Sequence, residues 1–102
     1  MAVYTSFEWH VTPGREDEFV QAWMKFAQLT RRDVDPAANA KLLRDSDDPS
    51  HFLSVGEWRD LDTIEHWRQS MGFEVNIAKL ESMTESMKVM TLDVAADTGS
   101  PA

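Results

Sequence analysis

The sequence contains no cysteine, and glycine is scarce, with four residues among 102. The absence of cysteine excludes disulfides, thiol nucleophiles, and the zinc or iron–sulfur sites that depend on cysteine ligands. No glycine-rich loop is present that could hold nucleotide phosphates. These absences remove several common classes of enzyme site from consideration.

Long apolar runs and basic residues are also lacking. No stretch approaches the length of a membrane span, and the first residues do not show a basic region followed by an apolar one. The 18 acidic residues outnumber the 10 basic ones, and the formal net charge of −8 argues against binding to nucleic acid or to an anionic membrane. We therefore expect a cytoplasmic protein with neither of these partners.

What the sequence does contain is a series of short periodic segments, within a length that suits one domain. Residues 3–11 alternate in the manner of a strand. One face carries Val3, Thr5, Phe7, Trp9 and Val11, and the other carries Tyr4, Ser6, Glu8 and His10. Acidic residues after Gly14 and apolar residues at helical spacing then predict a helix from about Glu16 to Arg32.

An acidic turn occupies the centre of the chain. Apolar segments at residues 39–44 and 51–58 flank it, and Asp, Ser and Pro are residues that favour tight reversals. The region therefore predicts a β-hairpin whose turn closes on Asp48-Pro49.

The remaining segments complete the pattern. Asp60 is a suitable N-cap for a second helix, which Gly72 interrupts and which continues to about Ser82. A last strand is expected from Met87 to Val94, before a disordered tail. We predict one domain over residues 1–96 and place the tail at residues 97–102.

The resulting order of elements is βαββαβ. With right-handed crossovers it predicts an α+β, ferredoxin-like domain, in which a four-stranded antiparallel sheet carries the helices on one face. The other face bears Tyr4, Ser6, Glu8 and His10 on the first strand and Met90, Leu92 and Val94 on the last. Because such a mixed polar and apolar face suits a partner surface, we predict a homodimer that closes the two sheets into a barrel.

Several short motifs resemble those of the antibiotic biosynthesis monooxygenase (ABM) domains, over about residues 2 to 95. These motifs are Pro13-Gly14-Arg15-Glu16 with Phe19, Leu43-Arg44-Asp45 with Asp48-Pro49 and Phe52, Glu57-Trp58 with Asp60, and His66-Trp67 before Phe73. The resemblance implies a dimeric α/β barrel. It also implies one of several functions, because the family includes cofactor-independent oxygenases of phenolic substrates, haem-degrading enzymes and proteins without known activity.

The haem-degrading branch can be tested on this sequence. That branch resembles the chain in having a tryptophan at the position of Trp67, but it also requires a histidine ligand and an asparagine at positions that fall on Ile77 and Phe7. Neither Ile77 nor Phe7 can perform those roles. The sequence therefore argues against haem degradation by that mechanism.

A cofactor-free oxygenase needs an apolar cavity, a group that orients or removes a phenolic proton, and exclusion of water. The resemblance implies a pocket between sheet and helices, and we place there Phe7, Trp9, Trp23, Trp67 and Ile77, with Asn76 as a polar group able to reach it. A tryptophan on the core face of a helix usually serves packing alone. Trp67 is the exception that the resemblance favours, whereas Trp58 is expected to be structural.

Three histidines could act as an acid or a base near neutral pH. His10 lies on the predicted dimer face, His51 opens a strand after the turn, and His66 neighbours Trp67 and is the histidine we consider for catalysis. Glu8 with His10 cannot form a metal site from one strand face alone, and no histidine pair has helical ligand spacing. We expect neither a metal nor another cofactor.

Two functions follow. The first is a monooxygenase that acts, without a cofactor, on a small aromatic hydroxylated substrate such as a phenol, a quinol or a polyketide-like compound. The alternative is a non-catalytic dimeric protein of the same fold that binds a small ligand or accompanies a pathway enzyme.

Overall fold

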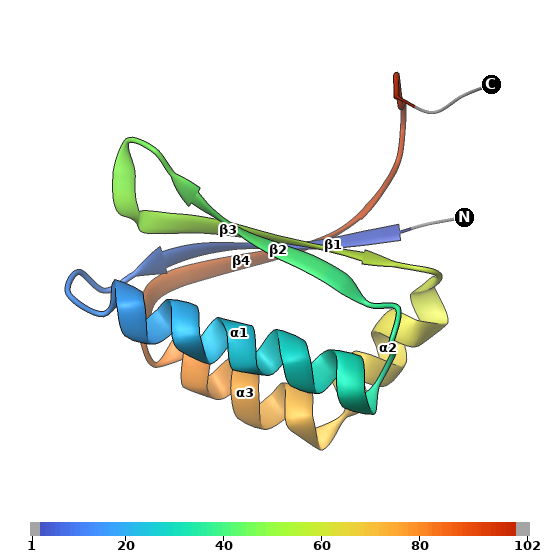
Figure 1. Cartoon of the computed structure of the whole chain (residues 1–102), viewed down its shortest axis with the longest axis horizontal. Coiled ribbons are helices and arrows are strands. Elements are labelled where there is room, and N and C mark those ends of the chain that lie inside the picture. Colours follow the sequence, from blue (N-terminus) through green and yellow to red (C-terminus); the bar gives the residue numbers. More distant parts are fainter. Residues whose placement is uncertain (1–2, 100–102) are drawn as a thin grey trace.

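The computed structural model describes residues 3–99. The elements follow the order β1 (Val3–Val11), α1 (Glu16–Asp33), β2 (Asn39–Asp45), β3 (Asp48–Trp58), α2 (Leu61–Gln69), α3 (Met71–Glu81) and β4 (Thr84–Asp93). The four strands form one antiparallel sheet in the order β2-β3-β1-β4, and all three helices lie on one of its faces (Figure 1). The predicted ferredoxin-like βαββαβ fold is confirmed.

Strand β1 has the predicted bounds and lies at the centre of the sheet, between β3 and β4. Its inner face points towards the helices, and Phe7, Trp9 and Val11 are buried there. On the outer face His10 is exposed and Glu8 is half-buried. The alternation seen in the sequence therefore separates the helix-facing side chains from the outer ones, although Ser6 on the outer face is also buried.

The β2–β3 hairpin is tighter than predicted. Asp45 pairs with Asp48, so the turn consists of two residues and Pro49 lies inside β3 rather than at the turn. The Asp45 carboxylate accepts a hydrogen bond from the Asp47 amide at 2.9 Å, which satisfies the reversed backbone. Proline, which has no N–H to donate, is tolerated at this point because the β2–β3 pairing shifts register between Arg44 and Asp45. At such a bulge no hydrogen bond from this residue to the neighbouring strand is needed.

The second helical region breaks at Ser70, not at Gly72. Ser70 is extended, its hydroxyl donates to the Trp67 carbonyl at 2.7 Å, and it accepts from the Phe73 amide at 3.1 Å. One serine therefore closes α2 and caps α3, a role that its short hydroxyl side chain favours. Gly72 lies in the first turn of α3, and the predicted cap at Asp60 is confirmed by its 2.8 Å hydrogen bond from the Thr63 amide.

Strand β4 starts three residues earlier than predicted, at Thr84. After Asp93, residues 94–99 contain no helix or strand and lead away from the sheet (Figure 1). Of the predicted tail, residues 100–102 lie outside the described residues, and the boundary at residue 96 stays a prediction.

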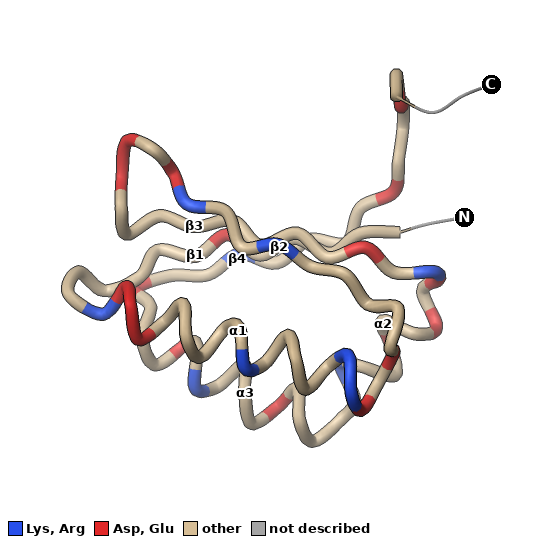
Figure 2. Tube along the Cα trace, in the orientation of Figure 1, with Lys and Arg blue, Asp and Glu red and all other residues tan. Residues whose placement is uncertain are grey.

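The core fills the space between the inner sheet face and the helices and is rich in aromatic rings. Its most deeply buried side chains are Trp9, Val11, Phe19, Phe52, Ile64, Leu80 and Met83. Figure 2 shows acidic residues at the hairpin tip and at both ends of α1, with basic residues scattered among them. Within residues 3–99, no helix is both long and apolar enough to cross a membrane.

Candidate active site

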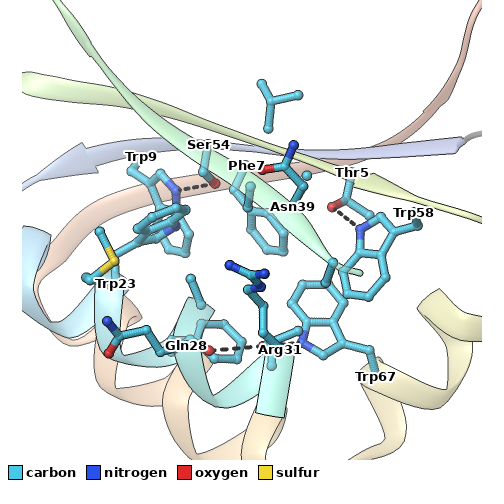
Figure 3. A pocket seen from close by; sticks show the side chains of 18 residues that line it. Thr5, Phe7, Trp9, Trp23, Gln28, Arg31, Asn39, Ser54, Trp58 and Trp67 are labelled. Atoms are coloured by element: carbon cyan, nitrogen blue, oxygen red, sulfur yellow. Dashed lines mark hydrogen bonds between the residues drawn. The ribbon is translucent and has the colours of Figure 1, made fainter. Parts of the chain in front are cut away.

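A cavity of about 250 Å³ lies between the inner face of the sheet and α1 (Figure 3). Its walls come from strands β1, β2 and β3, from one face of α1, and from Trp67 on α2. An apolar cavity of about 150 Å³ is large enough for benzene, so this one suits a somewhat larger aromatic molecule. The aromatic side chains in the wall are Phe7, Trp9, Trp23, Phe26, Trp58 and Trp67.

Two neighbouring strands supply the floor of the cavity through their alternation. Strand β1 contributes Thr5, Phe7 and Trp9, and β3 contributes Ser54, Gly56 and Trp58 from its own inner face. A side chain at Gly56 would crowd its neighbours, because a Cβ atom there would lie 3.2 Å from the Thr5 hydroxyl and 3.3 Å from the Trp58 indole nitrogen. The missing side chain thus keeps the floor open between two larger groups.

Three indole N–H groups around the cavity are each held by a hydroxyl side chain. Trp9 donates to Ser54 at 3.1 Å, and Trp58 donates to Thr5 at 3.0 Å. Trp67 donates to Thr30 on α1 at 3.1 Å. Because a buried donor without a partner is costly, these bonds fix each ring in one orientation.

Trp67 is the centre of the aromatic wall. Its ring lies 4.8 Å from Trp58 and 4.7 Å from Phe73, measured between centroids, and it also packs against Phe7 and Phe26. Its side chain is 6 % exposed. Trp67 therefore serves the core and the cavity together.

The predicted site residues fall into three groups. Phe7, Trp9, Trp23 and Trp67 line the cavity together. His66 and Asn76 instead line a separate hollow of about 150 Å³ on the other side of Phe26, Thr30 and Trp67, and Ile77 is absent from both linings and packs against the core.

The placement of Asn76 and Ile77 in the main pocket is thus corrected. Both lie on α3, beyond the break at Ser70, and no residue of α3 lines the main cavity. The Asn76 amide donates to the Gly72 carbonyl at 2.8 Å within its own helix. Arg44 stacks over Phe52 and Arg68 donates to the Thr91 hydroxyl, and neither lines the main cavity.

Sequence reasoning missed several wall residues. Trp58 was expected to be purely structural, yet it lines the cavity, and so do Thr5 and Ser54. The alternation of Phe52, Ser54, Gly56 and Trp58 on one face of β3 was the available signal. The mouth residues Gln28, Arg31 and Asn39 carried no comparable signal, since exposed polar residues are common on any helix or strand.

The cavity is nearly free of ionisable groups. Within residues 3–99, Arg31 is the one ionisable side chain in its lining, and no carboxylate or imidazole is part of the wall. The other polar side chains there are hydroxyls, carboxamides and indoles. The site can therefore hold an apolar ring and donate hydrogen bonds to it, but it carries no side chain suited to act as a general base at neutral pH.

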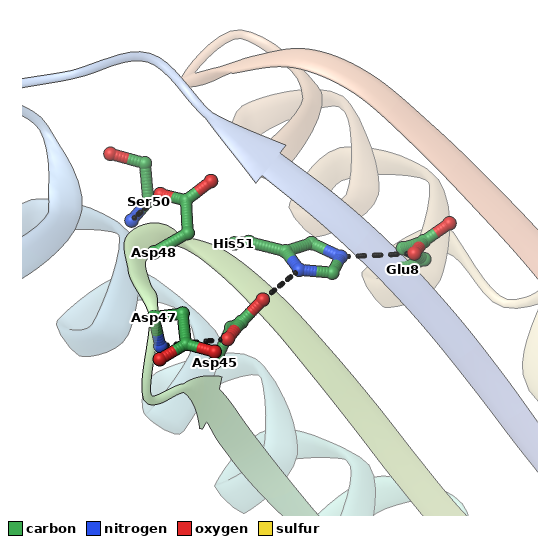
Figure 4. Close-up of polar contacts among 6 residues, drawn as sticks. All are labelled: Glu8, Asp45, Asp47, Asp48, Ser50 and His51. Atoms are coloured by element: carbon green, nitrogen blue, oxygen red, sulfur yellow. Dashed lines mark hydrogen bonds and ion pairs between the residues drawn. The ribbon is translucent and has the colours of Figure 1, made fainter.

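The outer face of the sheet holds a second polar cluster, formed by Glu8, Asp45 and His51 (Figure 4). The His51 ring donates from Nδ1 to Asp45 and from Nε2 to Glu8, both at 2.9 Å. Two donated bonds require the imidazolium form. Accordingly, the hydrogen bonds to Asp45 and then Glu8 raise the pKa of His51, and the bond from His51 lowers the pKa of both carboxyls.

The same face also brings together possible metal ligands. Donor atoms of Glu8, His10 and His51 lie within 4.8 Å of one another, and the rings of His10 and His51 stack at 4.5 Å. His51 supplies the third group that Glu8 and His10 lack on their own strand. However, both of its nitrogens are occupied by hydrogen bonds to carboxylates, so a metal would first have to displace a proton.

Known structures share this fold over nearly the whole chain. Two crystal structures of SnoaB, a cofactor-independent oxygenase from Streptomyces nogalater, match with TM-scores of 0.86 and 0.87 at 18% identity, covering 97% of this chain and 98% of SnoaB. An antibiotic biosynthesis monooxygenase matches at 0.78 and 18% identity, with 92% and 99% of the two chains covered. A conserved protein from Methanosarcina mazei Go1 matches at 0.79 and 14% identity, with 89% and 90% covered.

Identities this low establish the fold alone. A search of curated protein sequences finds no match. The sequence model of the family described as "Antibiotic biosynthesis monooxygenase" matches residues 2–79, which is more than half of the chain and includes β1 through most of α3. The protein therefore belongs to the antibiotic biosynthesis monooxygenase family.

Proposed function

We propose that the protein is a cofactor-independent monooxygenase that acts on a small aromatic hydroxylated substrate. The observation that carries this proposal is the cavity of about 250 Å³, walled by aromatic rings, with the indole N–H groups of Trp9, Trp58 and Trp67 already paired. Family membership and the shared fold with SnoaB, described as a cofactor-independent oxygenase, support the same reaction class.

In the proposed reaction the substrate supplies all the electrons. With an anthrone as the substrate, the CH₂ group next to a phenolic ring loses two hydrogens and becomes a carbonyl. One atom of O₂ enters that carbonyl, and the other leaves as water with the two hydrogens. The chain then needs only to bind the ring, orient it, and exclude water from the reacting carbon.

The wall residues divide these tasks. Phe7 and Trp67 lie edge to face, at 6.1 Å between centroids, and offer an apolar surface for a planar ring. Trp67 is proposed as the residue that touches the substrate. His66, our other catalytic candidate, lines the smaller hollow, so we assign it no part in the main cavity.

We further propose that the protein acts as a homodimer. The outer face of the sheet exposes large apolar side chains, among them Leu43, Leu53, Met90 and Leu92. A second copy packed on this face would cover them and close a barrel of two sheets, leaving each cavity on the opposite, helical side. Sedimentation of the purified chain should give about twice 11.6 kDa. A cytoplasmic location remains a prediction from the sequence.

The enzymatic proposal is tested by O₂ consumption with a panel of anthrones and hydroquinones. We expect uptake above the uncatalysed rate with at least one compound, and a clear loss in Trp67→Phe. Ile64→Val is the matched control, because Ile64 is buried on the same helix but does not line the cavity. Rates equal to background across the panel would reject the oxygenase.

One observation favours a second candidate function. Because no carboxylate or imidazole lines the cavity among residues 3–99, the site is also suited to a protein that binds an aromatic ligand without converting it. Saturable binding of panel compounds without O₂ uptake would identify this non-catalytic alternative.

A further inference from the structure

We propose that the cavity binds its aromatic ligand as an oxyanion, with the Arg31 guanidinium as counter-ion. This inference deepens the proposed function, since it names the ionised phenol as the bound form. It assigns to Arg31 the stabilisation of the ionised phenol, in a cavity whose described lining has no side chain suited to act as a general base.

The first observation is that Arg31 is not engaged elsewhere. Arg15 pairs with Glu18 and Arg32 pairs with Asp33, each at 2.8 Å. Within residues 3–99, no carboxylate lies within 4.0 Å of Arg31, and its one recorded hydrogen bond, from Nη2 to the Pro36 carbonyl, spans 3.5 Å. A guanidinium has five N–H donors in a planar fork, so most of its binding capacity is free.

The second observation is its direction. Arg31 follows Gln28 by three residues on α1, and both line the mouth of the cavity. Figure 3 shows the guanidinium reaching from the helix towards the sheet, into the space between Gln28 and Trp67. The charge is therefore placed where a ring held against Phe7 and Trp67 would present an oxygen.

The third observation concerns two buried hydroxyls on the opposite side. Thr5 and Ser54 are 3% and 5% exposed, and each accepts an indole N–H. Within the described residues neither has an acceptor for its own proton, whereas Thr30 donates to the Phe26 carbonyl at 3.0 Å. Two neutral donors thus face the cavity from the sheet, and a cationic donor faces it from the helix.

A site with donors on both sides and one net positive charge selects a ligand rich in oxygen acceptors, one of which is negative. An adjacent cation lowers the pKa of an acid, by about 1 to 3 pH units for a carboxyl beside an arginine. The same effect on a bound phenol, whose ordinary pKa is about 10, would raise the fraction of phenolate near neutral pH. The proton then leaves to water at the open mouth, and no side chain has to accept it.

This arrangement also fits the reaction class. The phenolate is the electron-rich form from which O₂ can accept an electron, whereas the neutral phenol holds its electrons more tightly. Arg31 would therefore act as a specificity-determining residue, and it would raise the fraction of ligand in the reactive form.

The test measures ionisation of a bound probe and does not depend on turnover. The probe is 4-nitrophenol, whose anion absorbs at longer wavelength than its neutral form, titrated with the full chain in excess. We expect the pKa of the bound probe to fall by at least one pH unit below that of the free probe. Arg31→Lys should keep most of this shift, and Arg31→Gln should abolish it.

Arg32→Gln is the matched control, because Arg32 neighbours Arg31 but pairs with Asp33 away from the cavity lining. It should leave the bound pKa unchanged. As a second measure, the affinity for 4-nitroanisole, which cannot ionise, is compared with that for the 4-nitrophenol anion. The wild type should bind 4-nitroanisole at least tenfold more weakly than the anion, whereas Arg31→Gln should bind the two compounds about equally.

An equal bound pKa in the wild type and Arg31→Gln would overturn the inference, and so would failure of the anion to bind. The outcomes also separate the two proposals. A lowered pKa without O₂ uptake from the panel would reject the oxygenase and leave the anion site standing. O₂ uptake together with an unshifted pKa of the bound probe would support the oxygenase and reject the anion site.

Discussion

The polar side chains on the two faces of the sheet are paired differently, as neutral groups on the inner face and as ions on the outer face. On the inner face, buried hydroxyls and indoles form neutral pairs, such as Trp58 with Thr5. On the outer face, the half-exposed His51 forms an ionic cluster with Glu8 and Asp45. Burying a charge costs far more than burying a paired neutral group, so the ions lie where their side chains are partly exposed in the single chain. Among residues 3–99, Arg31 is the one cation in the cavity lining, and it is exposed.

The strongest way to break the inner face is to remove its central ring. Trp67→Ala should lower the free energy of unfolding by about 3 to 5 kcal/mol, because four aromatic neighbours lose their contacts. Trp67→Phe should cost clearly less, since a ring remains. Urea denaturation followed by circular dichroism measures both, and equal losses would show that the indole ring is not a packing centre.

A smaller effect is expected from breaking one neutral pair. Thr5→Val removes the acceptor of the buried Trp58 N–H, which should cost roughly 1 to 3 kcal/mol. Thr5→Ser keeps the hydroxyl and is the control. If the valine variant were as stable as wild type in urea denaturation, the pair would contribute nothing to the inner face.

Adding a side chain to the floor of the cavity, in Gly56→Ala, should weaken ligand binding with only a small loss of stability. The Cβ atom of Gly56→Ala would crowd the Thr5 hydroxyl at 3.2 Å, for a loss of roughly 1 kcal/mol. Affinity for 4-nitrophenol, measured by absorbance titration, should fall as the cavity shrinks. Gly72→Ala is the control, because nothing lies within 4 Å of its Cβ position, and it should leave binding unchanged and stabilise α3.

The outer cluster should make the smallest contribution to stability, since its groups are partly solvated, but this contribution should depend on pH. The raised pKa of His51 gives stability that is complete below pH 6.5, the ordinary value, and is lost as the pH rises through the folded-state pKa. The lowered pKa values of Glu8 and Asp45 give stability that is lost as the pH falls through theirs.

The stability difference between wild type and His51→Gln should therefore be largest between about pH 4.5 and 6.5, the ordinary values of glutamate and histidine, and should shrink on both sides. Unfolding by urea across this range measures it. His66→Gln is the control, because His66 has no carboxylate partner among residues 3–99. A difference that does not change with pH would show that the cluster is not ionic.

Much of the fold could be predicted because its signals are local. The period of two in residues 3–11 defines both faces of β1, and Asp60 marks the start of α2. The break at Ser70 was misplaced because glycine disfavours helix in general, whereas the actual cause is a pair of hydrogen bonds that only the folded chain reveals.

The site was harder to predict because its pairs join distant segments. The partner of Trp58 is Thr5, 53 residues away, and the partner of Trp67 is Thr30 on another helix. Such pairs depend on strand register and helix packing, which no spacing rule contains. The direction of Arg31 likewise depends on how α1 lies across the sheet.

The hydroxyl–indole pairs of the inner face also bear on how the sheet assembles. Trp9 with Ser54 and Trp58 with Thr5 both join β1 to β3, and each pair is diagonal rather than directly opposite. A slip of one residue between these strands would turn one member of each pair to the outer face of the sheet and leave one indole, Trp9 or Trp58, in the core without its acceptor. The two pairs therefore favour the native alignment of β1 with β3, because a slipped alignment breaks both hydrogen bonds at once.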